Sequence, residues 1–319
     1  MSSNPKTIVI TGGLGYIGSN LIESLSIHFD KIVVLDKTTT IKYGALQPHV
    51  RLIKLNLADT ESISKMSVLF NELPSDTCII HLAAEKSVED SLKNPEFYLR
   101  ENVVGTKNLL EAMEKSDLHQ IIFASTAAVY GDPAGIELLH EQQETSPLSP
   151  YAKTKLMCEE LITSSRMVNL HYAILRFFNV AGATSKEFVE RDGVNLIPTL
   201  LSASRDSEEF KIYGDDYPTF DGTCVRDYVD VRDLVIAFHL CMEKLLTSNL
   251  GIINIGSGKG YSVLEVVKEM TKRIGNLPYS FGPRRAGDPS SVVADIDLAK
   301  TVLGWSPSYS IKDMIESVT

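Results

Sequence analysis

The chain has 319 residues, of which 44% are hydrophobic and 23% charged, a composition typical of a globular protein with one large α/β domain or a core and a smaller lobe. Its formal net charge is −10. Because binding a polyanion requires a surplus of Lys and Arg, we expect no nucleic-acid partner. No apolar run reaches membrane-spanning length, and we expect no signal peptide. Four cysteines without disulfide or metal-ligand spacing favour reduced thiols, no metal site and a cytoplasmic location.

Short apolar runs rich in β-branched residues alternate with segments of helical periodicity, and this alternation predicts an α/β fold with a Rossmann-type, doubly wound parallel sheet. After residue 179 the alternation ends, which predicts a smaller C-terminal α/β substrate lobe. We expect the first domain to span 1–180, with 228–255 returning to it, and the second lobe to comprise 181–227 and 256–319. The expected strands are residues 6–11, 31–36, 50–55, 77–83, 120–126 and 171–179.

A glycine-rich turn, TGGLGYIGSN, follows the first expected strand. Gly12 permits a tight turn, Gly15 lets the backbone approach a pyrophosphate, and Gly18 lets the next helix pack closely on the sheet. Asp36 ends the second expected strand, where an acid binds the ribose hydroxyls of adenosine and repels a 2′-phosphate. The glycines alone would also suit a tight turn without a ligand. Together with Asp36 they favour NAD over NADP.

A tyrosine and a lysine stand four residues apart in SPYAKTKLMCEEL. Ser149 can cap this helix and Pro150 suits its first turn, so Tyr151 and Lys155 share one helical face near its start. A nearby ammonium and the positive charge of an oxidised nicotinamide both favour a phenolate. We therefore predict that Tyr151 acts as a base with a lowered pKa. The alternative is an amphipathic helix that carries a surface Tyr and Lys.

These motifs resemble those of the extended short-chain dehydrogenase/reductase family, and they appear in that family's order. LAAEKSV (82–88), N-x-x-G-T from Asn102 and S-T-x-x-V-Y-G from Ser125 belong to the same series. The later segments are similar to UDP-glucose 4-epimerases and their sugar-nucleotide relatives. These segments are LRFFNVAGA (175–183), VNLIP (194–198), DYPTFDGTCVRDYVDVRDL (216–234), INIGSGKGYSVLEVV (253–267) and RRAGDPSSVVAD (284–295).

The resemblance implies a 4-epimerase that interconverts UDP-glucose and UDP-galactose. It would use NAD to remove a hydride from C4 and return it, through a 4-keto intermediate. The implied catalytic residues are Tyr151, Lys155 and Thr126. In related dehydratases an Asp-Glu pair follows the threonine, whereas here Ala127 and Ala128 follow it. Without an acid–base pair for elimination, the ketone can only be reduced again.

The resemblance also implies two sets of contacts. Its cofactor contacts map to Gly12, Gly15, Tyr16, Ile17, Gly18, Asp36, Lys37, Asn56, Leu57, Leu82, Ala83, Ala84, Lys86, Asn102, Ser125, Tyr151, Lys155 and Phe178. Its UDP-sugar contacts map to Lys86, Thr126, Tyr151, Asn179, Asn195, Leu196, Lys211, Ile212, Tyr213, Arg226, Arg285, Asp288 and Val292. The two arginines suit this role because guanidinium groups bind a diphosphate bidentately.

Four positions depart from the family pattern. Asn56 stands where an Asp is common near the adenine, Glu101 where an Asn is common, and Asp230 where a His is usual. Val292 maps to the residue that limits the sugar pocket. Its intermediate size leaves UDP-N-acetylhexosamines possible as substrates.

The resemblance leaves three alternatives for the function open and implies an association of two copies of the chain. The substrate could be a UDP-N-acetylhexosamine or a UDP-uronate, or the protein could bind NAD and UDP without turnover. Helices expected at 94–116 and 150–169 correspond to those that form a dimer contact in the family. We therefore expect a homodimer that acts on a small UDP-sugar.

Overall fold

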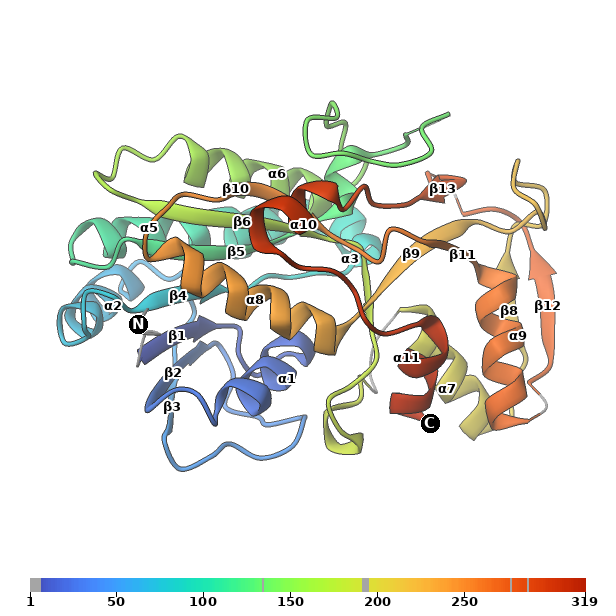
Figure 1. Cartoon of the computed structure of the whole chain (residues 1–319), viewed down its shortest axis with the longest axis horizontal. Helices are drawn as coiled ribbons and strands as arrows, with labels where there is room; N and C mark the ends of the chain where they lie inside the picture. The colour runs from blue at the N-terminus through green and yellow to red at the C-terminus, as the bar shows by residue number, and fades with distance from the viewer. Residues whose placement is uncertain (1–6, 134, 191–194, 276, 286) are drawn as a thin grey trace.

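The computed structural model describes residues 7–133, 135–190, 195–275, 277–285 and 287–319, and its larger lobe is built on one parallel sheet (Figure 1). Every strand pair in this sheet is parallel. The predicted α/β, doubly wound Rossmann-type fold is confirmed. In sheet order, the strands are β10 (Gly251–Ile255), β6 (His171–Phe177), β5 (Gln120–Thr126), β4 (Cys78–His81), β1 (Thr7–Thr11), β2 (Lys31–Asp36) and β3 (Val50–Lys54).

Helices cover both faces of the sheet, which explains why its central strands are apolar at nearly every position. Successive side chains of a strand point to opposite faces. Ile8 and Ile10 accordingly pack in one hydrophobic core, whereas Val9 packs in the other. One core is covered by α1 (Tyr16–Leu25), α8 (Val231–Leu245) and α10 (Asp297–Leu303), and the other by α2 (Ser62–Asn71), α5 (Gly105–Glu114) and α6 (Pro150–Thr163).

The smaller lobe lies beyond the carboxyl ends of the large sheet, at the right of Figure 1. It has its own hydrophobic core, formed by three helices and two short sheets. The helices are α7 (Leu196–Asp206), α9 (Val263–Ile274) and α11 (Ile311–Val318). The strands are β7 (Asn179–Ala181), β9 (Val225–Asp230), β11 (Gly260–Ser262) and β13 (Ser291–Val292) in one sheet, and β8 (Phe210–Tyr213) and β12 (Tyr279–Gly282) in the other.

The path between β4 and β5 is helical almost throughout. It consists of α3 (Val88–Lys93), α4 (Pro95–Tyr98), the π-helical turn η1 (Leu99–Val104) and α5. Two short 3₁₀ turns elsewhere are η2 (Ala127–Tyr130) and η3 (Lys186–Phe188). Among the described residues, no helix is both long and apolar enough to cross a bilayer.

The strand order reverses between β1 and β4, and ligands of open α/β sheets bind at such a point, beyond the carboxyl ends of the strands. Thr11, Asp36, His81 and Thr126 end four of the strands and therefore lie along this edge. The fold thus brings together the motifs that the sequence spreads over more than a hundred residues.

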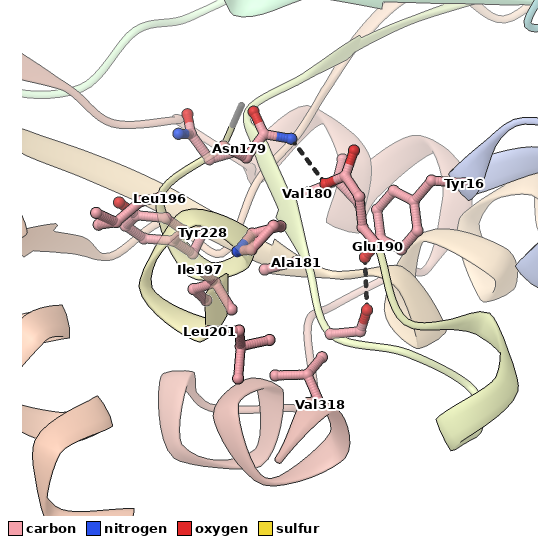
Figure 2. Close-up of a pocket in the computed structure, with 13 residues that line it drawn as sticks. Tyr16, Asn179, Val180, Ala181, Glu190, Leu196, Ile197, Leu201, Tyr228 and Val318 are labelled. Atoms are coloured by element: carbon pink, nitrogen blue, oxygen red, sulfur yellow. Dashed lines mark hydrogen bonds between the residues drawn. The ribbon is translucent and has the colours of Figure 1, made fainter. Parts of the chain in front are cut away.

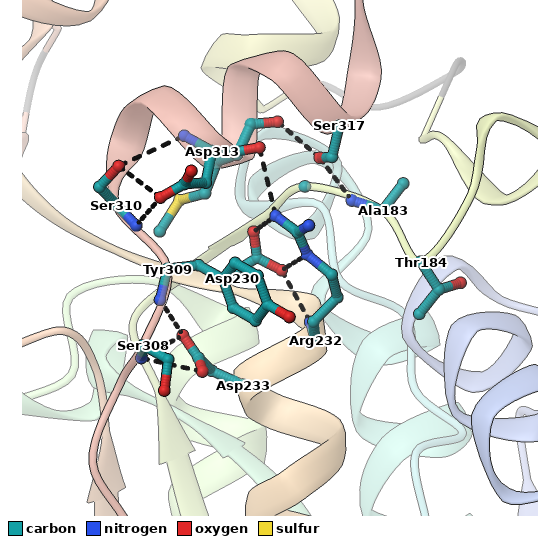
Figure 3. A network of polar contacts seen from close by, with 12 residues as sticks. Ala183, Thr184, Asp230, Arg232, Asp233, Ser308, Tyr309, Ser310, Asp313 and Ser317 are labelled. Atoms are coloured by element: carbon teal, nitrogen blue, oxygen red, sulfur yellow. Dashed lines mark hydrogen bonds and ion pairs between the residues drawn. The ribbon is translucent and has the colours of Figure 1, made fainter.

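A polar network anchors the C-terminal helix α11 to the end of β9 and the start of α8 (Figure 3). Asp230, which departs from the family pattern, caps α8 and accepts two hydrogen bonds from the Arg232 guanidinium, at 2.9 and 2.7 Å. Arg232 also donates to the backbone carbonyl of Asp313 in α11 and stacks 3.7 Å above the Tyr309 ring. The carboxylate of Asp233 accepts from the backbone N–H groups of Ser308 and Tyr309. Asp230 therefore has a structural role in this chain.

The glycine-rich turn brings α1 into close contact with β1. Gly12 has a φ of +68°, and a Cβ there would lie 2.6 Å from the Ala83 Cα. A Cβ at Gly18 would lie 2.6 Å from the Gly13 Cα and 2.7 Å from the Gly13 carbonyl oxygen. At Gly15 the nearest atom would be 3.4 Å away. Two of these glycines are therefore required by packing, and the third leaves the backbone open to a ligand.

The alanine variants of Gly18 and Gly15 test this distinction. Gly18→Ala should lower the free energy of unfolding by about 1–3 kcal/mol, since the added methyl group meets backbone atoms that cannot move aside. Gly15→Ala, the matched control, should change it by less than about 0.5 kcal/mol. Urea unfolding of the ligand-free proteins gives both values. Equal stability of the two variants would contradict the packing argument.

Candidate active site

The first turn of α1 and Asp36 form the part of the site nearest β1 and β2. Among the described residues, no side chain caps α1, so its first N–H groups are available to an anion. The buried Asp36 carboxylate accepts from the backbone N–H groups of Leu14 and Thr38, both at 3.1 Å. Each oxygen keeps a lone pair for a further donor, such as a ribose hydroxyl.

Two departures from the family pattern contact each other in the structure. The Asn56 amide donates to the Glu101 carboxylate at 3.2 Å, so the acid and the amide have exchanged places relative to the usual Asp and Asn. Lys37, which follows β2, pairs with Glu85 and lies 3.9 Å from the Glu101 carboxylate. These contacts join the segments after β2, β3 and β4. Leu57 is buried beside them.

Asn102 is buried and shapes the segment after β4. Its side-chain oxygen accepts from the Glu85 N–H at 2.8 Å, and its amide donates to the Glu85 carbonyl and to the Thr154 hydroxyl. The side chain therefore holds the path of the backbone after Leu82, Ala83 and Ala84, which lie next to the glycine-rich turn.

The implied catalytic residues meet at the end of β5. Tyr151 lies in the first turn of α6, which Ser149 caps as predicted, and its hydroxyl hydrogen-bonds the Thr126 side chain. Lys155 lies one turn further along α6, is buried, and donates to the Ala124 carbonyl at 2.7 Å. Its ammonium also lies 4.7 Å from the centre of the Phe123 ring. The structure therefore brings Tyr151, Thr126 and Lys155 together.

Burial controls the electrostatics of these groups in the protein alone. It raises the pKa of Tyr151 to about 12, while the hydrogen bond with Thr126 acts in the opposite direction. It lowers the pKa of Lys155 to about 8. The lowered pKa that the sequence predicts for Tyr151 is therefore not a property of the protein alone, because desolvation outweighs the hydrogen bond.

A buried ion pair lies directly behind the catalytic residues. The Arg176 guanidinium donates to both oxygens of Glu159, at 3.0 and 2.6 Å, and the Ser125 hydroxyl donates to the same carboxylate. Ser125, an implied cofactor contact, thus bonds within the protein. Our sequence analysis missed Glu159. Its position four residues after Lys155 was the available signal, because that spacing places it on the same buried face of α6.

On the far side of the site, the smaller lobe presents the implied nucleotide contacts. Arg226 donates to the Asp288 carboxylate at 2.6 Å and to two backbone carbonyls, so protein groups hold this guanidinium. The Arg285 guanidinium stacks 4.2 Å above the Tyr213 ring. Three further implied contacts, Lys211, Ile212 and Tyr213, lie on the short strand β8.

A small cavity of about 20 Å³ lies between Tyr16 of the larger lobe and residues of the smaller lobe (Figure 2). Asn179, Asn195 and Leu196 line it, as does Tyr16, whose hydroxyl donates to the Gly182 carbonyl at 2.6 Å. Glu190, which our sequence analysis missed, also lines the cavity. No periodic pattern marks it, and one of its partners, Lys86, is 104 positions away in the sequence. Its carboxylate accepts from Lys86 and Asn195, at 2.6 and 2.9 Å.

Apolar side chains form the wall next to Thr126. Val292, on β13, packs against a cluster that includes Ala127 and Phe178. Ala128 follows in the 3₁₀ turn η2 and its N–H donates to the Thr126 hydroxyl. The described residues therefore place no carboxylate where an eliminating enzyme would need one immediately after the threonine.

The pKa of Lys155 predicts how stability depends on pH. Above about pH 8 the folded protein has lost this proton, whereas the unfolded chain keeps it up to about pH 10.5. The wild type should therefore gain stability relative to Lys155→Met as the pH rises from 7 to 10. Urea unfolding of the ligand-free proteins across this range measures the difference, with Lys272→Met, an exposed lysine on α9, as the control. Parallel pH curves for Lys155→Met and the wild type would contradict the burial argument.

Comparisons with known proteins agree with this arrangement. A model of the NAD dependent epimerase/dehydratase family matches residues 8–256. The chain is 38% identical over 316 residues to the UDP-glucose 4-epimerase of Lactobacillus helveticus, covering 97% of this chain and 94% of that protein.

Two solved structures are also similar over almost the whole chain. The UDP-glucose 4-epimerase from Brucella ovis in complex with NAD gives a TM-score of 0.90 at 31% identity, covering 98% of this chain and 97% of that one. The enzyme from Bifidobacterium longum in complex with NAD⁺ and UDP gives 0.84 at 32% identity, covering 98% and 96%. The chain therefore belongs to the NAD dependent epimerase/dehydratase family, as a UDP-glucose 4-epimerase-like member.

Proposed function

We propose that this protein is an NAD-dependent 4-epimerase that interconverts UDP-glucose and UDP-galactose. One observation carries the proposal: the Tyr151 hydroxyl contacts the Thr126 side chain at the end of β5. The two residues after Thr126 are Ala127 and Ala128, which have no acidic group. This arrangement can hold and move a proton at a sugar hydroxyl, but it offers no acid for elimination. Two relatives that are each 38% identical to this chain carry the same activity in their names, which supports the assignment.

The residues beyond the carboxyl ends of the strands, where the strand order reverses between β1 and β4, fit NAD. The open backbone at Gly15 and the uncapped N–H groups of α1 suit its pyrophosphate, and the Asp36 carboxylate suits its adenosine ribose. Asp36 would repel the 2′-phosphate of NADP. When bound, NAD would supply the hydride acceptor and donor for the reaction at C4.

The protein's own residues move the proton. Tyr151 removes the proton of the 4-hydroxyl as a phenolate and donates it back when C4 is reduced again. Thr126, which hydrogen-bonds Tyr151, orients the 4-oxygen. Lys155 lies one turn away, and its positive charge favours the phenolate. Since burial opposes that ionisation, Lys155 and the cationic nicotinamide must together lower the Tyr151 pKa.

Turnover of purified protein tests the proposal. With NAD and UDP-galactose, we expect formation of UDP-glucose until equilibrium is reached. Tyr151→Phe should lower kcat by about 100-fold or more, the range typical for loss of a general base, while NAD stays bound. Tyr172→Phe, near the opposite end of β6, is the matched control and should keep wild-type turnover.

The same assay separates the alternatives. UDP-N-acetylglucosamine and UDP-glucuronate are offered in parallel, with product sugars resolved by chromatography. Preference for either would replace the hexose assignment. No turnover of any of the three, with NAD and UDP both bound, would instead favour a non-catalytic binding protein.

The proposal also assigns one ligand to each lobe. We assign NAD to 1–180 with 228–255, and the UDP-sugar to 181–227 with 256–319. Within 256–319, however, α10 and Trp305 pack in the hydrophobic core of the large sheet. The four cysteines are buried and unpaired, which supports a cytoplasmic location for the protein.

We infer that a second copy of the chain covers the outer face of α3, α4, η1 and α6. These elements pack together and expose several large apolar side chains. Burying such a group of side chains in a dimer removes apolar surface from water. The exposed residues are Val88, Leu92, Phe97, Leu99, Val104 and Met157.

Charge at this face should prevent association. Leu99→Glu with Met157→Glu should change a dimer into a monomer, since two acids would face their copies across the interface. Light scattering after size-exclusion chromatography measures the mass. Ile27→Glu, an exposed apolar residue next to α1, is the control. A wild-type monomer, or an unchanged dimer in the double variant, would exclude this interface.

A further inference from the structure

Glu190 is a buried carboxylate in the wall of the cavity, with an exposed side-chain fraction of 5%. One of its oxygens accepts from the Lys86 ammonium at 2.6 Å, and the other accepts from the Asn195 amide at 2.9 Å (Figure 2 draws Glu190 within the cavity wall). Both oxygens therefore have a donor within the protein.

The three residues come from different parts of the fold. Lys86 lies in the segment after β4, on the larger lobe, and is 60% exposed at its side chain. Glu190 follows η3, and Asn195 is the N-cap residue of α7 in the smaller lobe. Glu190 thus connects the edge of the large sheet to the start of α7. Its hydrogen bond fixes the orientation of the Asn195 amide.

A negative charge in this place conflicts with the ligand that the proposed function requires. Asn195 is an implied contact of the UDP-sugar, so a diphosphate bound there would come close to the Glu190 carboxylate. Two negative charges that lie close together repel each other strongly in a partly buried site. The Lys86 ammonium lies in direct contact with Glu190 and makes the pair neutral overall.

We propose that Glu190 is a positioning residue for the substrate diphosphate, because it orients the Asn195 amide that would contact this group. Lys86 is then the counter-ion that neutralises the Glu190 carboxylate and so limits its repulsion of the diphosphate. This inference rests on the proposed function, because it takes a UDP-sugar as the ligand. It gives Lys86 a role through Glu190, in place of a direct phosphate contact. The two roles predict different behaviour when both charges are removed.

A double-mutant cycle on UDP binding tests the proposal. UDP is titrated calorimetrically into NAD-loaded wild type, Lys86→Met, Glu190→Gln and the double variant. Lys86→Met leaves the carboxylate unpaired beside the diphosphate and should weaken UDP binding at least tenfold. In the double variant the glutamine still accepts from Asn195 without a charge. It should therefore bind UDP at least fivefold more tightly than Lys86→Met does.

Two further measurements identify the cause as charge. An unpaired buried carboxylate takes up a proton more readily. UDP binding to Lys86→Met should therefore improve, relative to the double variant, as the pH falls from 8 to 5.5. Lys86→Arg keeps the positive charge and should bind UDP within threefold of the wild type. Lys272→Met, which removes a lysine from an exposed ion pair on α9, controls for net charge.

The outcomes separate this inference from the proposed function. If the double variant binds UDP as weakly as Lys86→Met, Lys86 contacts the phosphates directly and the proposal is wrong. Wild-type affinity in Lys86→Met would also overturn it. Failure of the wild type to bind UDP would reject the proposed function, and this inference with it. UDP binding by the wild type without rescue in the double variant would reject this inference alone.

Discussion

The ion pair between Arg176 and Glu159 fixes the geometry on which the site depends. Both side chains are almost fully buried, and the pair joins β6 to α6 while Ser125 at the end of β5 donates to the same carboxylate. Leaving either charge without its partner costs about 3–5 kcal/mol, so the helix cannot shift along the sheet without breaking a strong contact. Lys155 and Tyr151 lie one and two turns earlier on that helix. Their distance from Thr126 is therefore set by a contact that takes no part in the chemistry.

Burial shifts the pKa values of the two groups that this helix carries in opposite directions, and in both cases it favours the neutral form. It raises the pKa of the Tyr151 phenol and lowers that of the Lys155 ammonium, so the protein alone disfavours the phenolate–ammonium pair. A positive charge brought next to the phenol reverses the balance for Tyr151, and the phenolate then favours the ammonium in return. A site of this kind is a weak base until the cationic cofactor is in place. We infer that the enzyme limits unwanted proton transfer in this way.

The parts of this structure that sequence could predict are those with a local pattern. Apolar runs indicated the central strands, and Ser149 with Pro150 indicated the start of α6, because strand burial and helix capping leave periodic or adjacent signals. Contacts between distant residues leave none. Lys86 and Glu190, for example, are 104 positions apart. The hydrogen bond between Asn56 and Glu101 and the ion pair between Arg226 and Asp288 also follow from no sequence spacing. The pKa of Tyr151 was also out of reach, since burial depends on the packed fold.

The apolar wall next to Thr126 affects how a sugar could bind in the proposed reaction. Beyond Thr126 and Tyr151, the neighbouring cluster of Ala127, Phe178 and Val292 offers no side-chain hydrogen-bond donor or acceptor. A sugar held there by hydroxyl contacts would prefer one face, because turning it over would leave polar partners unsatisfied. An apolar wall imposes no such preference. In the proposed reaction the affinity then comes from the nucleotide, for which we propose contacts on the smaller lobe at Asn195, Arg226 and β8. Separating anchoring from chemistry in this way lets both epimers present C4 to the same phenol.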